Sequence, residues 1–178
     1  LANLALESYY SLSNSSVLTA EVSEQVKKNT IATGCCFAEV EVDIELGKIK
    51  ILHIINVHDS GKLLNPKLAE MQVHGGMLMG YGLSEQLILD EKTGRPLNGT
   101  LLDYKLMTMM DTPDIKADFV ELDDPIGPFG NKALGEPPAI PGAPAIRNAV
   151  LHATGVAFNE NPLTPQRLID GFIRAGLI

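Results

Sequence analysis

Apolar and polar residues alternate along the stretch that follows Cys35, with the period of a half-buried β-strand. The apolar positions are Val40, Val42 and Ile44, and the polar positions between them are Glu39, Glu41, Asp43 and Glu45. A Gly47-Lys48 turn follows, and the apolar run over residues 49–57 fits the returning strand. Residues 35–57 therefore predict a hairpin with a solvated acidic face, because like charges on one face repel unless water or a metal screens them.

A helix is predicted from Asn65-Pro66, a favourable cap followed by proline at the first helical position, to about Glu85. Four glycines interrupt it, namely Gly75, Gly76, Gly80 and Gly82. Each costs roughly 0.5 to 1 kcal/mol relative to alanine inside a helix. Either other backbone or a ligand approaches this helix closely, or the helix packs tightly on another helix through its small residues.

The rest of the chain predicts a mixture of strands and helices without a repeated βαβ order, and we assign the fold class α+β. No composition shift or linker divides residues 1–178, so we expect one unit. The further elements are a second hairpin or extended excursion over 86–104 with its turn at 90–94, a short strand over 117–122, a helix over 143–154 closed by Gly155, and a last helix from Thr164-Pro165 to near Gly176.

Composition narrows the class of protein. The 178 residues are 45% hydrophobic and carry a formal net charge of −8 without a basic cluster, which argues against nucleic-acid binding. No apolar run reaches the roughly 18 residues that span a bilayer, and the first residues lack the pattern of a signal peptide. Cys35 and Cys36 are adjacent, a poor geometry for a mutual disulfide, so we expect reduced thiols and a cytoplasmic location.

Two polar residues lie in constrained settings. Glu136 stands between Gly135 and two prolines in an irregular segment over 123–144, so a stiff loop aims one carboxylate, as a general base requires. A solvated loop glutamate is the alternative. Gln72 begins the glycine-rich part of the helix over 65–85, where its amide can donate and accept, or it is a surface glutamine. Lys132 either favours the ionised form of Glu136 or is solvated.

Other catalytic patterns are absent from the sequence. The 4 histidines have no metal-binding spacing and are interpreted as structural. Neither a serine nucleophile elbow nor a phosphate-binding glycine loop occurs.

Five groups of residues, in order along residues 35–178, carry a family resemblance. They are Asn65-Pro66 with Gln72-Val-His-Gly75-Gly76 and Gly80-Tyr-Gly82; Leu102-Asp103-Tyr104-Lys105 with Asp111-Thr-Pro113; Asn131-Lys132-Ala-Leu-Gly135-Glu136-Pro137-Pro138; Ala145-Ile-Arg147-Asn148-Ala149; and Pro162-Leu-Thr164-Pro165. Together they resemble the carboxyl-terminal part of the molybdenum-binding subunit of xanthine dehydrogenases. The chain is then a fragment or a split subunit, and the resemblance places it within a molybdenum cofactor-binding domain.

The resemblance implies a molybdopterin-dependent hydroxylase that oxidises purines at a carbon beside a ring nitrogen. Glu136 is then the base that takes a proton from the molybdenum-bound hydroxyl. Gln72, Gly75, Gly76 and Gly135 line the molybdenum-molybdopterin cofactor, and no side chain of this chain ligates the metal. The family's substrate-orienting arginine and aromatic clamps lie upstream of the stretch that this chain covers.

The resemblance also implies partners. They are the remaining molybdenum-binding polypeptide, an iron-sulfur subunit with 2Fe-2S clusters and an FAD subunit, in an oligomer that acts on a small heterocycle, so this chain alone is expected to be inactive. Two alternatives stay open: the same chemistry on nicotinate, an aldehyde or another N-heterocycle, and a noncatalytic binding or assembly module that keeps the fold.

Overall fold

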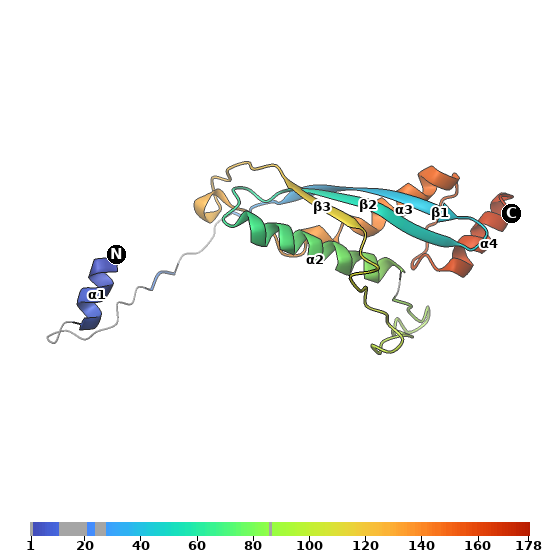
Figure 1. The fold of residues 1–178 in the computed structure, drawn as a ribbon, viewed down its shortest axis with the longest axis horizontal. Helices are drawn as coiled ribbons and strands as arrows, with labels where there is room; N and C mark the ends of the chain where they lie inside the picture. Colours follow the sequence, from blue (N-terminus) through green and yellow to red (C-terminus); the bar gives the residue numbers. More distant parts are fainter. Residues whose placement is uncertain (1, 11–20, 24–27, 86) are drawn as a thin grey trace.

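A three-stranded mixed sheet organises the chain, in a computed structural model that describes residues 2–10, 21–23, 28–85 and 87–178. Its strands are β1 (Thr33–Asp43), β2 (Lys48–Asp59) and β3 (Asp114–Phe119), in the order β1-β2-β3 (Figure 1). β1 and β2 pair antiparallel, which confirms the predicted hairpin, with one register irregularity between Glu39 and Val40.

Four α-helices and two short 3₁₀ helices complete the described fold. The helices are α1 (Ala2–Tyr10), α2 (Pro66–Glu85), α3 (Gly142–Thr154) and α4 (Pro165–Ala175), and the 3₁₀ turns are η1 (Pro128–Gly130) and η2 (Pro137–Ala139). The predicted α+β class without a repeated βαβ order is confirmed, and one such unit occurs. β3 pairs parallel to β2, so β2, α2 and β3 form a parallel crossover.

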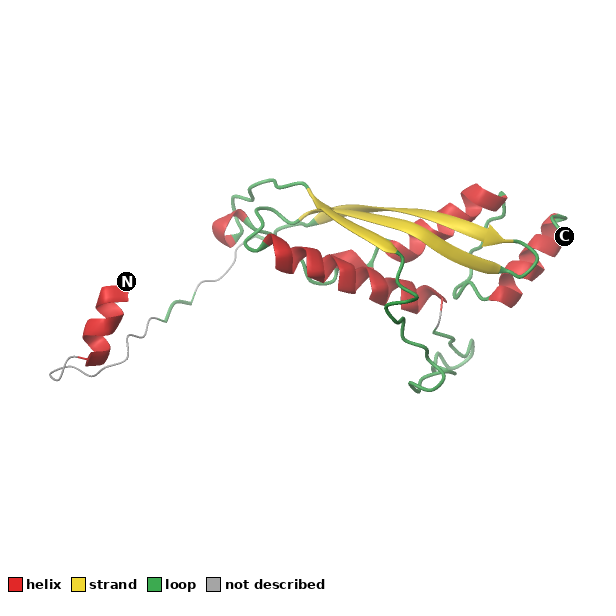
Figure 2. Cartoon of the chain, in the orientation of Figure 1, coloured by secondary structure: helices red, strands yellow, loops and turns green. Residues whose placement is uncertain are grey.

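Helices α2 and α3 cover one face of the sheet, and they run along it in Figure 2. Their shared core holds Ile54 of β2, Val73 and Met77 of α2, and Ile146 of α3. A second core at the hairpin end joins α3, α4 and the loop between them, through Val150, Phe158, Leu163, Leu168 and Phe172. Val40, Val42 and Ile44 pack against this second core while the acidic residues between them are exposed, which confirms the predicted two-faced hairpin.

Local signals set the helix ends as expected. The Asn65 side chain accepts a hydrogen bond from Leu68 N at 3.1 Å and caps α2. The Thr164 hydroxyl accepts from Arg167 N at 3.3 Å and caps α4. Gly155 ends α3 with a left-handed φ of 74°.

Two regions differ from their predicted form. Residues 87–104 hold only an isolated bridge between Leu89 and Pro96, closed by a turn in which the Asp90 carboxylate accepts from Thr93 N at 2.7 Å. The predicted second hairpin is therefore reduced to a single bridge in the part of this stretch that the structure describes. The short strand lies at Asp114–Phe119 instead of 117–122, because it aligns with the end of β2.

The two cysteines are free, and Cys36 packs against the core between the sheet and α2. Burial, followed by the neighbouring Cys35, raises the pKa of the Cys36 thiol to about 11, so this group stays protonated at neutral pH. Among the described helices, none combines the length and apolar character that crossing a bilayer requires.

Candidate functional site

Glu136 lies at the end of the irregular segment, directly before the η2 turn that its two prolines begin. Its carbonyl oxygen accepts a hydrogen bond from Ala139 N at 2.9 Å, and its own backbone is already helical, with φ −83° and ψ −23°. The side chain is exposed. The carboxylate thus stands on a short turn whose φ angles are fixed by the proline rings.

The Gln72 amide holds this turn from α2. Its Nε2 donates to the carbonyl oxygen of Gly135 at 2.7 Å. The two polar residues that the sequence predicts for the site, Gln72 and Glu136, are therefore brought together, with one peptide unit between the amide and the residue that carries the carboxylate.

A second amide holds the other side of the turn, and sequence reasoning missed it. Asn56 of β2 is fully buried, and its Nδ2 donates to the carbonyl oxygen of Pro138 at 3.2 Å. One feature of the sequence could have indicated Asn56, namely a polar residue inside the apolar run over 49–57. A polar side chain that is buried in such a run usually has a hydrogen-bond partner.

The glycines of α2 divide into two roles. A Cβ on Gly80 would lie 2.3 Å from the carbonyl oxygen of Ala139, and one on Gly76 would lie 2.8 Å from the Pro138 Cβ. Of the alternatives left open by the sequence, close approach of other backbone is confirmed for these two positions. Gly75 differs, since nothing lies within 4 Å of its missing Cβ, and the same holds for Gly135.

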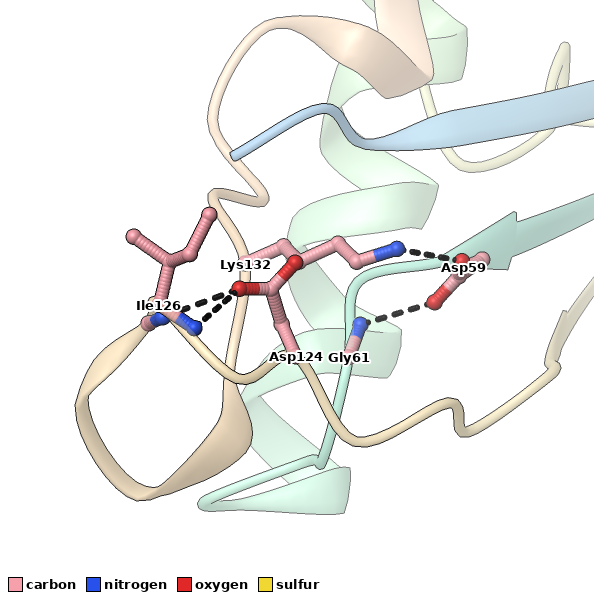
Figure 3. A network of polar contacts seen from close by, with 6 residues as sticks. Asp59, Gly61, Asp124, Ile126 and Lys132 are labelled. Carbon is pink, nitrogen blue, oxygen red and sulfur yellow. Dashed lines mark hydrogen bonds and ion pairs between the residues drawn. The ribbon is translucent and has the colours of Figure 1, made fainter. Parts of the chain in front are cut away.

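Lys132 does not have either predicted role. Its Nζ lies 2.6 Å from Asp59 Oδ2, and both side chains are only 11% exposed, so it is neither solvated nor directed at Glu136 (Figure 3). Asp59 also accepts from Gly61 N at 2.9 Å. The hydrogen bond from Lys132, and after it that from Gly61, lower the pKa of the Asp59 carboxyl below its ordinary value.

Backbone bonds tie the loop before Glu136 to the end of β2. Lys132 N donates to Ser60 O at 2.7 Å, and Lys62 N donates to Gly130 O at 2.8 Å. The Asp124 carboxylate closes the outer part of the loop, where it accepts from Ile126 N and Gly127 N (Figure 3). Phe129 in this loop has a left-handed φ of 57° and is 83% exposed, a conformation that these surrounding bonds hold in place.

His58 of β2 is a buried histidine, and its strand neighbours are Gly34 of β1 and Phe119 of β3. It is 1% exposed, neither ring nitrogen has a hydrogen-bond partner, and burial lowers its pKa below 6.5. Its place in the sheet interior agrees with the predicted structural role.

This burial predicts a specific dependence of stability on pH. Well above pH 6.5 the ring is neutral in both the folded and the unfolded chain. As the pH falls below that value, the unfolded chain binds a proton that the buried ring resists, so the free energy of unfolding decreases until the folded pKa is reached. Thermal unfolding of the complete protein at about pH 7.5 and about pH 5.5 should therefore show a smaller decrease in Tm for His58→Leu than for wild type.

The exposed His152 on α3 gives the matched control, because His152→Gln should keep the wild-type pH response. Equal responses of wild type and His58→Leu would contradict this role of burial.

The sequence of residues 2–113 matches the family of molybdopterin cofactor-binding domains. The chain belongs to this family. The match includes Gln72 and Gly75, while Gly135 and Glu136 lie beyond it.

Relatives of this molybdopterin cofactor-binding domain extend the match over the whole chain. The xanthine dehydrogenase molybdenum-binding subunit of Escherichia coli O157:H7 is 52% identical over 180 residues, which are 100% of this chain and 24% of that protein. The aldehyde oxidoreductase molybdenum-binding subunit PaoC of Escherichia coli K12 is 34% identical over 84% of this chain and 20% of its own length. The predicted family resemblance is confirmed, and the chain spans about a quarter of the length of the relatives first matched.

Solved structures carry the same fold. CO dehydrogenase from Oligotropha carboxidovorans superposes with a TM-score of 0.72 and 28% identity, over 82% of this chain and 19% of that chain. Quinoline 2-oxidoreductase from Pseudomonas putida 86 superposes with a TM-score of 0.66 and 32% identity, over 75% of this chain and 18% of its own.

The residues of this chain fit a molybdopterin group on two observations. Gly75 lies three residues after Gln72, and nothing lies within 4 Å of a Cβ added at Gly75 or at Gly135, so a bulky group can approach the backbone at both positions. The exposed Glu136 directly follows Gly135, whose carbonyl oxygen accepts the bond from Gln72. A Cβ on Gly76 would meet Pro138, so the approach of the loop is by itself a reason for glycine at this position.

Proposed function

We propose that the chain forms the carboxyl-terminal portion of the cofactor-binding domain in a molybdopterin-dependent hydroxylase of xanthine dehydrogenase type. The observation that supports the proposal best is the 2.7 Å bond between Gln72 Nε2 and Gly135 O, because it ties the Gln72 amide to the peptide that precedes Glu136. The match over 100% of the chain at 52% identity favours a purine as the substrate.

In this proposal, each site residue acts through a property seen in the fold. Glu136 accepts a proton at its carboxylate, which is exposed and stands on a rigid turn. Gln72 fixes the peptide before it. Gly75, Gly76 and Gly135 admit the cofactor, and Gly76 also leaves room for Pro138. When bound, the molybdenum centre supplies Lewis acidity and a two-electron redox couple.

The proposal includes a partner polypeptide that completes the domain. α2 exposes a row of apolar side chains at helical spacing, Leu68, Met71 and Met79, beside Gln72. Exposed apolar rows of this kind are typical of surfaces that another polypeptide covers. We assign the covering segment to the rest of the molybdenum-binding subunit, with iron-sulfur and FAD subunits receiving the electrons in a cytoplasmic oligomer.

The test uses the complete enzyme that contains this chain. We expect molybdenum in the purified protein and a kcat/KM for xanthine or hypoxanthine at least about tenfold above that for nicotinate or an aldehyde, a difference of about 1.4 kcal/mol in transition-state binding. A higher kcat/KM for an aldehyde or another heterocycle would support the alternative in which the same hydroxylation acts on that substrate. A protein without molybdenum and without turnover would favour the noncatalytic module. The presence of both Gln72 and Glu136 in the sequence argues against that module.

A further inference from the structure

We propose that Asn56 and the Asp59–Lys132 ion pair are positioning residues for the carboxylate of Glu136, an inference that rests on the proposed function. All three lie outside the residues assigned above to the cofactor or to proton transfer. Asn56 and Asp59 both belong to β2, and Lys132 belongs to the loop that leads to Glu136.

The two attachments bracket the residue that they position. The ion pair fixes the loop at Lys132, where Nζ lies 2.6 Å from Asp59 Oδ2, and the backbone bond from Lys132 N to Ser60 O adds a second contact at the same residue. Asn56 fixes the loop at Pro138 through its 3.2 Å bond to the carbonyl oxygen. One strand therefore holds the Glu136 turn at both ends, and α2 holds it between them through Gln72.

The attachments at Lys132 and Pro138 lie close to Glu136 in the sequence, so a displacement of either one should move Glu136. Only Ala133, Leu134 and Gly135 separate Lys132 from Glu136, and η2 begins directly after it. A loop this short cannot absorb a shift of the backbone at Lys132 or Pro138. Such a shift therefore moves the Glu136 carboxylate. Misplacement of a reacting group by about 1 Å can lower a rate by about a hundredfold.

Lys132 acts on Glu136 through position and not through charge. Its ammonium group is bound to a carboxylate that is also only 11% exposed, so the two charges compensate each other. Removing the lysine frees the loop from β2, so we expect kcat to fall while KM changes little.

The experiment measures kcat, KM and molybdenum content of the complete enzyme with a purine substrate. We expect Lys132→Met to lower kcat about tenfold to a hundredfold, with KM within about twofold and molybdenum near wild type. Lys132→Arg should recover most of the activity, because it keeps the charged bond to Asp59. Lys92→Met, at an exposed lysine in the turn over 90–94, is the control and should leave kcat unchanged.

Combination with Glu136→Gln separates the possible outcomes. If Lys132 positions the carboxylate, Lys132→Met adds nothing to the loss caused by Glu136→Gln, whereas independent effects would multiply and overturn the inference. Near-full activity of Lys132→Met would overturn it too. If Glu136→Gln itself stays active, the proposed function fails first.

Asn56→Ala provides the second variant, in case Lys132→Met does not assemble with its cofactor. The same loss of kcat, and the same absence of a further effect in the Glu136→Gln background, are expected because Asn56 fixes the other end of the turn. Multiplicative effects of Asn56→Ala and Glu136→Gln would contradict the inference independently.

Discussion

Replacing Glu136 with glutamine in the complete enzyme should lower kcat by about a hundredfold to ten-thousandfold, the range that a positioned general base contributes. Glutamine keeps the size of the side chain and removes its ability to take a proton. Because Glu136 is exposed and its carbonyl oxygen, not its side chain, accepts the hydrogen bond from Ala139 N, the fold and the molybdenum content should stay near wild type. Steady-state kinetics and metal analysis of the same preparation measure both quantities.

Glu41→Gln is a matched control, since Glu41 is an exposed glutamate on the acidic face of β1. It should leave kcat within about twofold, as expected for a surface substitution away from the site. If Glu136→Gln instead keeps more than half of the wild-type kcat, Glu136 is not the base. If it loses activity together with molybdenum, Glu136 contributes to cofactor retention, and the lost activity is no evidence that it takes a proton.

Gly80→Ala should be among the most destabilising single-atom additions in the described fold. Its Cβ would lie 2.3 Å from the carbonyl oxygen of Ala139 and 3.2 Å from the carbonyl carbon, and a backbone atom cannot move aside as a flexible side chain does. Overpacking costs about 1 to 3 kcal/mol and occasionally more, which outweighs the 0.5 to 1 kcal/mol that alanine gains in helix propensity. We expect a net loss of about 2 kcal/mol, a lower Tm and a displaced η2 turn with reduced kcat.

Gly75→Ala on the same helix is the control for stability, because nothing lies within 4 Å of its missing Cβ. Thermal unfolding should show Gly75→Ala equal to or slightly above wild type and Gly80→Ala clearly below it. Equal Tm values for the two variants would contradict the conclusion that the close approach of η2 to α2 requires glycine at position 80.

Elements that depend on local sequence were predicted well. The hairpin follows from alternation over 35–57, and the ends of α2 and α4 follow from cap residues whose side chains bond within the same turn. The parallel pairing of β3 with β2 was not predicted, because it depends on how α2 crosses the sheet and not on the composition of β3. Over 87–104 the predicted turn at 90–94 formed with one antiparallel bridge, which agrees with the extended alternative, because turn residues alone do not supply a ladder.

The site could be predicted only in part for a similar reason. Family resemblance indicated Gln72 and Glu136. No local sequence pattern, however, shows that the Gln72 side-chain amide donates to the carbonyl oxygen of Gly135. Lys132 was misassigned because its partner Asp59 is 73 residues away in sequence, and the pair forms only once the loop lies on β2. The four glycines of α2 indicated a close approach, and the structure was needed to identify η2 as the neighbour of two of them.

The most direct test of the account is a high-resolution structure of the complete, cofactor-loaded enzyme. We expect the Glu136 carboxylate to face the cofactor, with the Gln72 Nε2 to Gly135 O bond and the Asp59–Lys132 pair preserved as they are in this chain. A structure in which Glu136 points into solvent, on the side of its turn that faces away from the cofactor and from Gln72, would contradict it.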